Sequence, residues 1–114
     1  MLLCTKNDLF PQPQIPFCFG WPSFSAGVGC LSFLRFDPSW DSLEDPERDR
    51  NLFIRSCHMI CREICHQLGL RNCIYYECLM NGFATADEQR RGGIKILCTC
   101  CLKKLKQNVG FDAT

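Results

Sequence analysis

Four cysteines in the C-terminal half constrain this chain more than any other feature of its sequence. Cys73 and Cys78 are separated by four residues, Cys98 and Cys101 by two, and seventeen residues lie between Met80 and Cys98. Four thiolates supplied as two close pairs can surround one tetrahedral zinc ion with bonds of about 2.3 Å, if the chain between the pairs folds back. We therefore predict that these four cysteines bind a structural zinc ion.

The length of the chain makes such a site important for stability. A chain of 114 residues has room for one domain, and it buries only about two thirds of its unfolded surface. We therefore expect residues 1–114 to form a single domain with a small core, to which zinc binding contributes on the order of 10 kcal/mol. A hydrophobic content of 46% and a charged content of 22% are typical of globular rather than disordered proteins.

Charge and hydropathy argue against two classes of partner. The net charge of +1 gives no reason to expect nucleic acid or an anionic membrane. No apolar run approaches the ~20 residues of a membrane span. The N-terminal MLLCTKND has too short an apolar run for a secretory leader and reaches Lys6 and Asp8 at once. We therefore expect a reducing location, cytoplasmic or also nuclear.

The chain has eleven cysteines, and in a reducing compartment most of them are expected to be metal ligands or free thiols rather than disulfides. Cys100 is adjacent to Cys101, and we interpret it as a free thiol or an alternative ligand. Six further cysteines show no metal-ligand spacing with one another. We expect most of these to be small buried apolar residues, and we assign them no function. They are Cys4, Cys18, Cys30, Cys57, Cys61 and Cys65.

The pattern along the chain predicts an α+β fold. Residues 1–26 contain the proline-rich PQPQIP and WPSF, which predict an irregular segment with short strands. Alternation over Gly27–Phe36 predicts a largely covered strand. The charged, proline-broken segment Asp37–Arg50 predicts a solvated loop.

From Asn51 the apolar residues recur at three- and four-residue steps as far as Leu68, and Gly69 then offers a left-handed cap. This pattern predicts a helix of about five turns. A cysteine-bearing turn, a polar stretch and a Gly92-Gly93 break follow. A second helix is predicted from about Cys98 to Gln107.

The predicted long helix carries a second set of metal-site positions. A zincin places two histidines four residues apart around a glutamate, as H-E-x-x-H, because one helical turn brings both imidazoles to one metal. This sequence has Arg62, Glu63 and His66 in that register. In the metzincin extension of this motif, a glycine stands three residues after the second histidine, and a third metal ligand stands three residues after the glycine. Here those positions hold Gly69 and Asn72.

Together these features resemble the archaemetzincin family of metzincin-clan zinc metallopeptidases, whose pattern is HExxHxxGxxHCx4CxMx17CxxC. The trailing CLKKL and VGF also match. Upstream, DLFP, FCFGWPSFSAGVGCLSFLRFDP and IRSC look like the family's edge strand, next strand and helix start, so the resemblance covers about residues 7 to 112. It implies a truncated metzincin-like domain with a short mixed sheet, one long active-site helix and a zinc-bound C-terminal turn and helix. The strands before DLFP and the helix after VGF are expected to be absent, so the domain is expected to be incomplete at both ends.

The resemblance also implies an activity, which is hydrolysis of a peptide or protein substrate lying along an edge strand, with an aminopeptidase-like preference. Glu63 stands at the general base, which takes a proton from water beside the zinc and passes it to the leaving amine. His66 stands at the second zinc ligand, and Met80 at the methionine turn. Arg62 and Asn72 stand where the first and third histidine ligands belong.

These two departures favour loss of the catalytic zinc. Arginine offers no lone pair and would place a positive charge beside a dication, and the carbonyl of Asn72 is a weak zinc ligand beside imidazole. We expect Arg62 to pair with a carboxylate of the Asp37–Arg50 loop in preference to its neighbour Glu63.

Two alternatives stay open for the positions on the helix. A thiol of Cys61 or Cys65 could join His66 in an altered metal site, and Arg62 could be a sequence error. Two hypotheses about function follow. One is an archaemetzincin-like metallopeptidase, impaired here. The other is a non-catalytic, zinc-stabilised peptide-binding module or a decayed paralogue. We favour the second, with one structural zinc, no catalytic zinc and a monomeric state.

Overall fold

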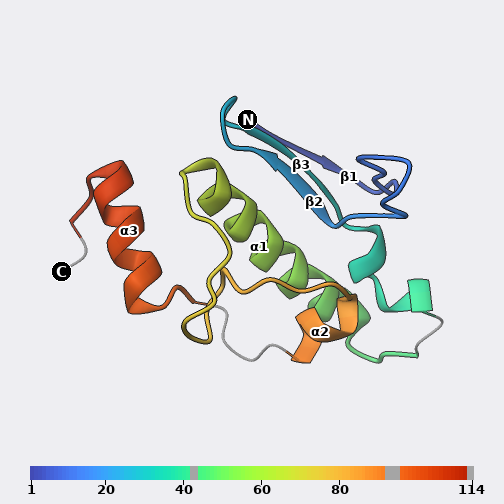
Figure 1. Ribbon diagram of the computed structural model, residues 1–114. Helices are drawn as coiled ribbons and strands as arrows, with labels where there is room; N and C mark the ends of the chain where they lie inside the picture. Colours follow the sequence, from blue (N-terminus) through green and yellow to red (C-terminus); the bar gives the residue numbers. More distant parts are fainter. Residues whose placement is uncertain (42–43, 92–95, 113–114) are drawn as a thin grey trace.

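A computed structural model describes residues 1–41, 44–91 and 96–112 of the chain. Its longest element is helix α1, Arg48–Gln67, which has a small sheet on one side and helix α3, Thr99–Val109, on the other (Figure 1). This arrangement confirms the predicted α+β fold. The helix begins at Arg48 rather than Asn51, and it ends before Gly69, whose φ of 94° is the left-handed conformation that favours glycine.

The sheet has three strands in the order β1-β3-β2. The central strand β3, Val28–Ser32, runs parallel to β1, Leu2–Thr5, and antiparallel to β2, Gly20–Ser23. The strand predicted over Gly27–Phe36 is shorter than expected because Leu34–Phe36 turns into a 3-10 helix. Among the described residues, strand β2 pairs with one neighbouring strand, so its second edge has no strand partner there.

Two predictions about the N-terminal segment are wrong. A strand does precede DLFP, because β1 pairs with β3 there. The DLFP segment is not the edge strand, since it forms only an isolated bridge between Leu9 and Cys18, and β2 occupies the edge. Proline has no N–H to donate to a ladder, and PQPQIP, which begins at the last residue of DLFP, contains three prolines. This limits pairing in that part of the chain.

The segment predicted as a loop, Asp37–Arg50, is more ordered than expected. It contains a 3-10 helix, Pro38–Asp41, and the first turn of α1. Arg48 Nε donates a hydrogen bond of 2.7 Å to Asp37 Oδ1. The guanidinium of Arg48 accordingly holds the pKa of Asp37 well below its usual range. This ion pair connects the start of α1 to the end of the sheet region.

Two apolar clusters lie on different sides of α1. Phe19, Leu31, Phe36 and Met59 fill the space between the sheet and the helix, and the rings of Phe19 and Phe36 stack at 5.1 Å. The second cluster joins the end of α1 to the cysteine turn and α3. Its members are Cys65, Leu70, Cys73, Cys78, Met80 and Cys101. The long helix therefore contributes to both clusters.

The buried face of α1 differs from the face predicted by its apolar residues. Met59, Glu63 and His66 are buried at four- and three-residue steps, together with Cys65. Phe53 and Ile64, which belonged to the predicted apolar pattern, are 69% and 43% exposed. The helical period was correct, but the face directed to the interior carries two ionisable side chains.

The polar stretch after the cysteine turn contains a short helix, α2, Ala86–Arg91, that was not predicted. Thr85 Oγ1 accepts from the Glu88 N–H, and Glu88 Oε2 accepts from the Ala84 N–H. This arrangement resembles a capping box, a signal present in the sequence. The expected Gly92-Gly93 break lies outside the described residues. No helix among the described residues is long and apolar enough to span a membrane.

Most of the cysteines without metal-ligand spacing are not buried, contrary to expectation. Cys4 and Cys61 are exposed, Cys18, Cys30 and Cys57 are half-buried, and Cys65 alone of the six is buried. The sheet covers α1 on one face, so the outer sides of the strands and of the helix stay accessible. All eleven cysteines are free thiols.

Candidate functional site

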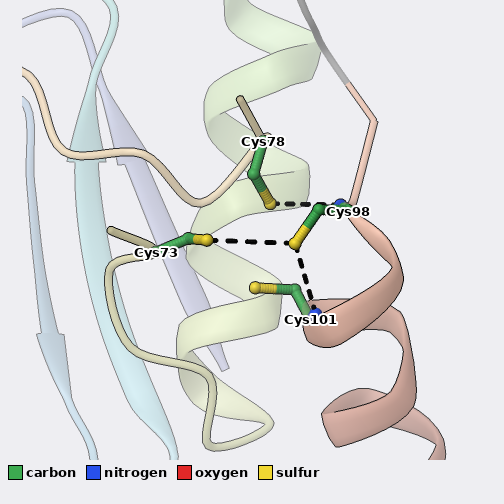
Figure 2. Close-up of side chains that lie close together, drawn as sticks. All are labelled: Cys73, Cys78, Cys98 and Cys101. Atoms are coloured by element: carbon green, nitrogen blue, oxygen red, sulfur yellow. Dashed lines mark hydrogen bonds between the residues drawn. The ribbon is translucent and has the colours of Figure 1, made fainter. Parts of the chain in front are cut away.

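The four cysteines with zinc-ligand spacing meet at one point. Their Sγ atoms all lie within 4.8 Å of one another, as a group that could hold a metal ion. Figure 2 shows that Cys73 and Cys78 approach from the turn after α1, while Cys98 and Cys101 approach from the start of α3. Two segments distant in sequence therefore converge on a single centre.

The donors of this cluster fit a tetrahedral zinc ion. Bonds of about 2.3 Å to one tetrahedral ion place its sulfurs about 3.8 Å apart, and Cys73 Sγ lies 3.8 Å from Cys98 Sγ. Backbone N–H groups already point at two of the sulfurs. Cys98 N donates to Cys78 Sγ at 3.3 Å, and Cys101 N donates to Cys98 Sγ at 3.4 Å. Such donors stabilise thiolates, which is the form that binds metal.

The pKa values of two cysteines in the cluster shift in opposite directions. Hydrogen bonding with the Tyr76 backbone lowers the pKa of Cys73 to about 7. Burial raises the pKa of Cys101, because a thiolate loses hydration there. A cation at the centre would offset that cost by pairing with the buried thiolates.

Two other residues of this region, Met80 and Cys100, had roles predicted from the sequence. Met80 is fully buried, with 0% of its surface exposed, and packs in the cluster beside Cys78. Cys100 is exposed and is not part of the four-sulfur group. The cluster therefore consists of the four cysteines that the spacing selected.

A cleft of about 690 Å³ opens between β2, α1 and the segment that follows Gly69. Its polar lining comes from Arg62, Glu63, His66, Arg71 and Asn72. Aromatic side chains form much of the remaining wall; they are Phe17, Phe19, Trp21, Phe24 and Phe83. The cleft brings together all four of the sequence-predicted site residues on the helix and after its glycine turn.

Arg62 and Asn72 contact each other within the cleft. Arg62 Nη2 donates a hydrogen bond of 2.6 Å to Asn72 Oδ1. Arg62 Nη1 lies 3.5 Å from Glu63 Oε1, which is a long contact for an ion pair. The predicted pairing of Arg62 with a carboxylate of the Asp37–Arg50 loop is therefore wrong. The turn at Gly69 brings Asn72 back over the helix, and it delivers a closer acceptor than the loop does.

Glu63 is nearly enclosed, with 1% of its surface exposed. A Cβ added at Gly20 would lie 2.7 Å from Glu63 Oε1, so the glycine allows β2 to approach the carboxylate. Burial raises the pKa of Glu63, and the neighbouring Arg62 lowers it in part. Glu63 Oε2 has no hydrogen-bond partner among the described residues. A buried carboxylate with a raised pKa is suited to proton transfer.

His66 is held in a fixed orientation. Its Nδ1 lies 2.7 Å from the carbonyl oxygen of Leu70, and an acceptor at that position selects the tautomer with the proton on Nδ1. Burial lowers the pKa of His66, which favours the neutral ring. The ring also packs edge-on against Phe24, with centroids 5.8 Å apart. The neutral imidazole therefore keeps a lone pair on Nε2, as a metal-ligating histidine does.

Comparison with known proteins places this geometry in a family. The chain is 33% identical to rat archaemetzincin-2 over 131 residues, an alignment that covers 95% of this chain and 36% of the relative. It is also 33% identical to human archaemetzincin-1 over 134 residues, which covers 94% of this chain and 26% of the relative. The chain belongs to the archaemetzincin family. No protein-family model matches it.

The fold agrees with that assignment. The archaemetzincin chain superposes on a zinc-dependent peptidase from Methanocorpusculum labreanum with a TM-score of 0.79 and 29% identity, covering 91% of this chain and 52% of the other. The sequence spans about a third or less of the length of the curated archaemetzincins that it matches. Membership of a zinc-peptidase family agrees with the mixed sheet and helices of this chain and with its four-cysteine cluster.

Sequence reasoning identified the cysteine cluster and the helix residues of this archaemetzincin cleft but missed part of its lining. It gave no role to Arg71, whose guanidinium lies over the Phe24 ring at 4.6 Å. It also missed the aromatic wall. The signal available was the position of Arg71 directly before Asn72, on the turn expected to return to the helix.

Proposed function

We propose that this archaemetzincin chain is a catalytically silent module that is stabilised by zinc at its four cysteines and binds peptides in the cleft without cutting them. The observation that supports silence is the hydrogen bond of 2.6 Å between Arg62 Nη2 and Asn72 Oδ1. The family resemblance places zinc-binding histidines at these two positions. In this chain the first position holds the cationic Arg62, and the third holds Asn72, which accepts its hydrogen bond.

The chemistry of these two side chains opposes a second metal. A guanidinium has no lone pair for a metal and stays charged, so it repels a dication at short range. The Oδ1 of Asn72 is already engaged by Arg62. His66, with its Nε2 lone pair, is then the one good ligand left of the family's three. A catalytic zinc site needs three protein ligands.

The positive charge next to Glu63 is consequently a guanidinium, whereas the general base of a zinc metallopeptidase lies beside a zinc ion. Its carboxylate faces the Arg62 guanidinium at 3.5 Å. We propose that Glu63 keeps the position of the general base without the Lewis acid that the reaction requires. The other side chains of the cleft can still bind and orient a peptide.

The open edge of β2 supports peptide binding. Ser32 N donates to Phe19 O at 2.8 Å, so Phe19 and Ser32 form a hydrogen-bonded pair, and the next position, Gly20, directs its N–H and C=O away from β3. These groups belong to the cleft wall. An extended peptide can add to such an edge through main-chain hydrogen bonds. The adjacent aromatic wall offers apolar surface to its side chains.

The four cysteines have the structural role in this proposal. They would hold a zinc ion that ties the turn after α1 to the start of α3, and the metal would supply folding energy rather than catalysis.

Zinc content and hydrolysis test the proposal together. We expect elemental analysis of the purified chain to give about one zinc per chain, with no cleavage in assays that detect new amino termini in a mixed peptide library. The matched comparison is Arg62→His with Asn72→His, for which we expect a second zinc. Peptide cleavage by the unmodified chain would overturn catalytic silence, and about two zinc ions per chain would contradict the loss of the second metal. A double variant that folds but gains no metal would contradict the placement of the lost site.

A further inference from the structure

The cleft carries more positive than negative charge although its centre holds a carboxylate. The charged residues of its described lining are Arg62, Arg71 and Glu63, which with neutral His66 gives a formal charge of +2 − 1 = +1. Arg71 forms no ion pair with any described residue. The charge of the cleft is therefore left for an anionic ligand to balance.

We propose that the cleft binds the C-terminal carboxylate of a peptide, held by Arg62 and Arg71, with the last side chain of the peptide against the aromatic wall. This inference rests on the proposed function, because it names the end of the peptide that a silent cleft would hold. It assigns to Arg62 the task of ligand recognition at a position where the family resemblance implies a metal ligand.

Arg62 has hydrogen-bond donors to spare for a ligand. An arginine carries five N–H donors, and those of Arg62 have two acceptors, Glu63 Oε1 and Asn72 Oδ1. Its Nε is buried and has no hydrogen-bond partner among the described residues. Its side chain is 13% exposed, so a ligand would meet it largely out of water, where a charge-assisted hydrogen bond is strong.

The aromatic wall holds both guanidinium groups in place. Arg71 Cζ lies 4.6 Å from the Phe24 ring centroid, and Arg62 Cζ lies 5.3 Å from that of Phe83. Stacking on a ring restrains a guanidinium while the N–H groups at its rim can still reach a carboxylate. The same rings offer apolar contact to a side chain next to the carboxylate.

The charge balance selects a carboxylate over a phosphate. A net charge of +1 is matched by one carboxylate, whereas a phosphate near neutral pH carries close to two negative charges. The buried Glu63 carboxylate would repel that extra charge. Aromatic surface around the anion site also fits an organic acid better than inorganic phosphate.

The test measures binding to the zinc-loaded full chain by calorimetry, with N-acetyl-Ala-Ala-Phe as the free acid and as the C-terminal amide. We expect the acid to bind at least about tenfold more tightly, as a charge-assisted contact implies. Arg71→Gln should weaken the acid to near the level of the amide and leave amide binding unchanged. The matched control is Lys103→Gln on α3, where an exposed charge lies outside the cleft lining and neither affinity should change.

Each contrary result has a separate meaning. Equal affinity for acid and amide, without hydrolysis, overturns the carboxylate anchor and leaves the silent peptide-binding module standing. Inorganic phosphate that displaces the acid more effectively than acetate overturns the choice of a carboxylate. An Arg71→Gln effect of equal size on both peptides overturns the assigned role of Arg71. Failure of both peptides to bind overturns the anchor and peptide binding together, whereas cleavage of the peptide overturns catalytic silence.

Discussion

The cysteine cluster and the cleft are adjacent in this chain but have different ligand sets. Asn72 and Cys73 are consecutive, yet Cys73 joins a set of four sulfurs within 4.8 Å, while Asn72 accepts a hydrogen bond from Arg62 in the cleft that also contains His66. We expect that a set of ligands that stabilises the fold cannot lose a member without loss of structure. A set that serves catalysis can be replaced by a pair of complementary side chains while the fold remains.

The two regions also differ in how buried charge is balanced. In the cysteine cluster, backbone N–H groups favour thiolates, and burial of Cys101 opposes its thiolate in the absence of a cation. In the cleft, the cation belongs to the protein itself, because Arg62 faces the buried Glu63 carboxylate. One region therefore offers four sulfurs that could hold a metal ion, and the other already contains an arginine.

The largest effect is expected from removal of one cysteine of the four-sulfur cluster. Cys98→Ser removes one of four ligands, and we expect loss of zinc and of cooperative folding, since zinc contributes on the order of 10 kcal/mol. Elemental analysis and thermal melting followed by circular dichroism measure both losses. Cys100→Ser is the matched control, because Cys100 is exposed and outside the cluster, and it should leave zinc content and melting unchanged. A cooperative melt for zinc-free Cys98→Ser would show that the fold does not depend on the metal.

The next largest effect is expected from removal of the positive charge of Arg62 in the cleft. Arg62→Met leaves the Glu63 carboxylate buried without its cation, and we expect a loss of about 3–5 kcal/mol in the free energy of unfolding. Denaturant titration of the zinc-loaded protein measures it. Addition of Glu63→Gln should restore part of the loss, because the uncompensated charge is gone. An unchanged free energy of unfolding in Arg62→Met would show that the Arg62–Glu63 pair does not stabilise the fold.

A packing variant sharpens the comparison by separating apolar contacts from metal binding. Met80→Ala removes a fully buried side chain from the cluster, and we expect a cost of about 2–5 kcal/mol with zinc retained. Ile74→Ala in the same turn is the control, because Ile74 is 84% exposed, and it should stay within about 0.5 kcal/mol. Loss of zinc from Met80→Ala would show instead that packing and ligand geometry cannot be separated here.

The smallest effect concerns the titration of His66. Burial lowers the pKa of this imidazole, so its NMR titration midpoint should lie below the usual value of about 6.5. The unfolded chain then takes up the proton at higher pH than the folded one, and stability should fall as the pH drops below about 6.5. His66→Asn identifies the signal and removes this part of the pH dependence. An imidazole that does not titrate in a chain with two zinc ions would mean that the cleft binds metal.

Some of this structure could be read from local pattern. Thr85 and Glu88 carry a capping signal for α2 that a closer search of the sequence would have found. The parallel pairing of β1 with β3 could not be found in that way, because Leu2–Thr5 is a short run whose strand character depends on a partner over twenty residues away. The partial exposure of Cys18 and Cys57 likewise depends on which faces the sheet and helix cover.

The sequence by itself determined the four-cysteine cluster, the long helix, the glycine turn and the family resemblance, because each depends on fixed spacing along one or two local segments. Only the tertiary structure decided what Arg62 contacts. Loop carboxylates and Glu63 were the candidates by sequence, and Asn72 is the partner at 2.6 Å. The physical reason is that the turn at Gly69 sets the distance between two side chains ten residues apart, which local spacing along the sequence does not fix.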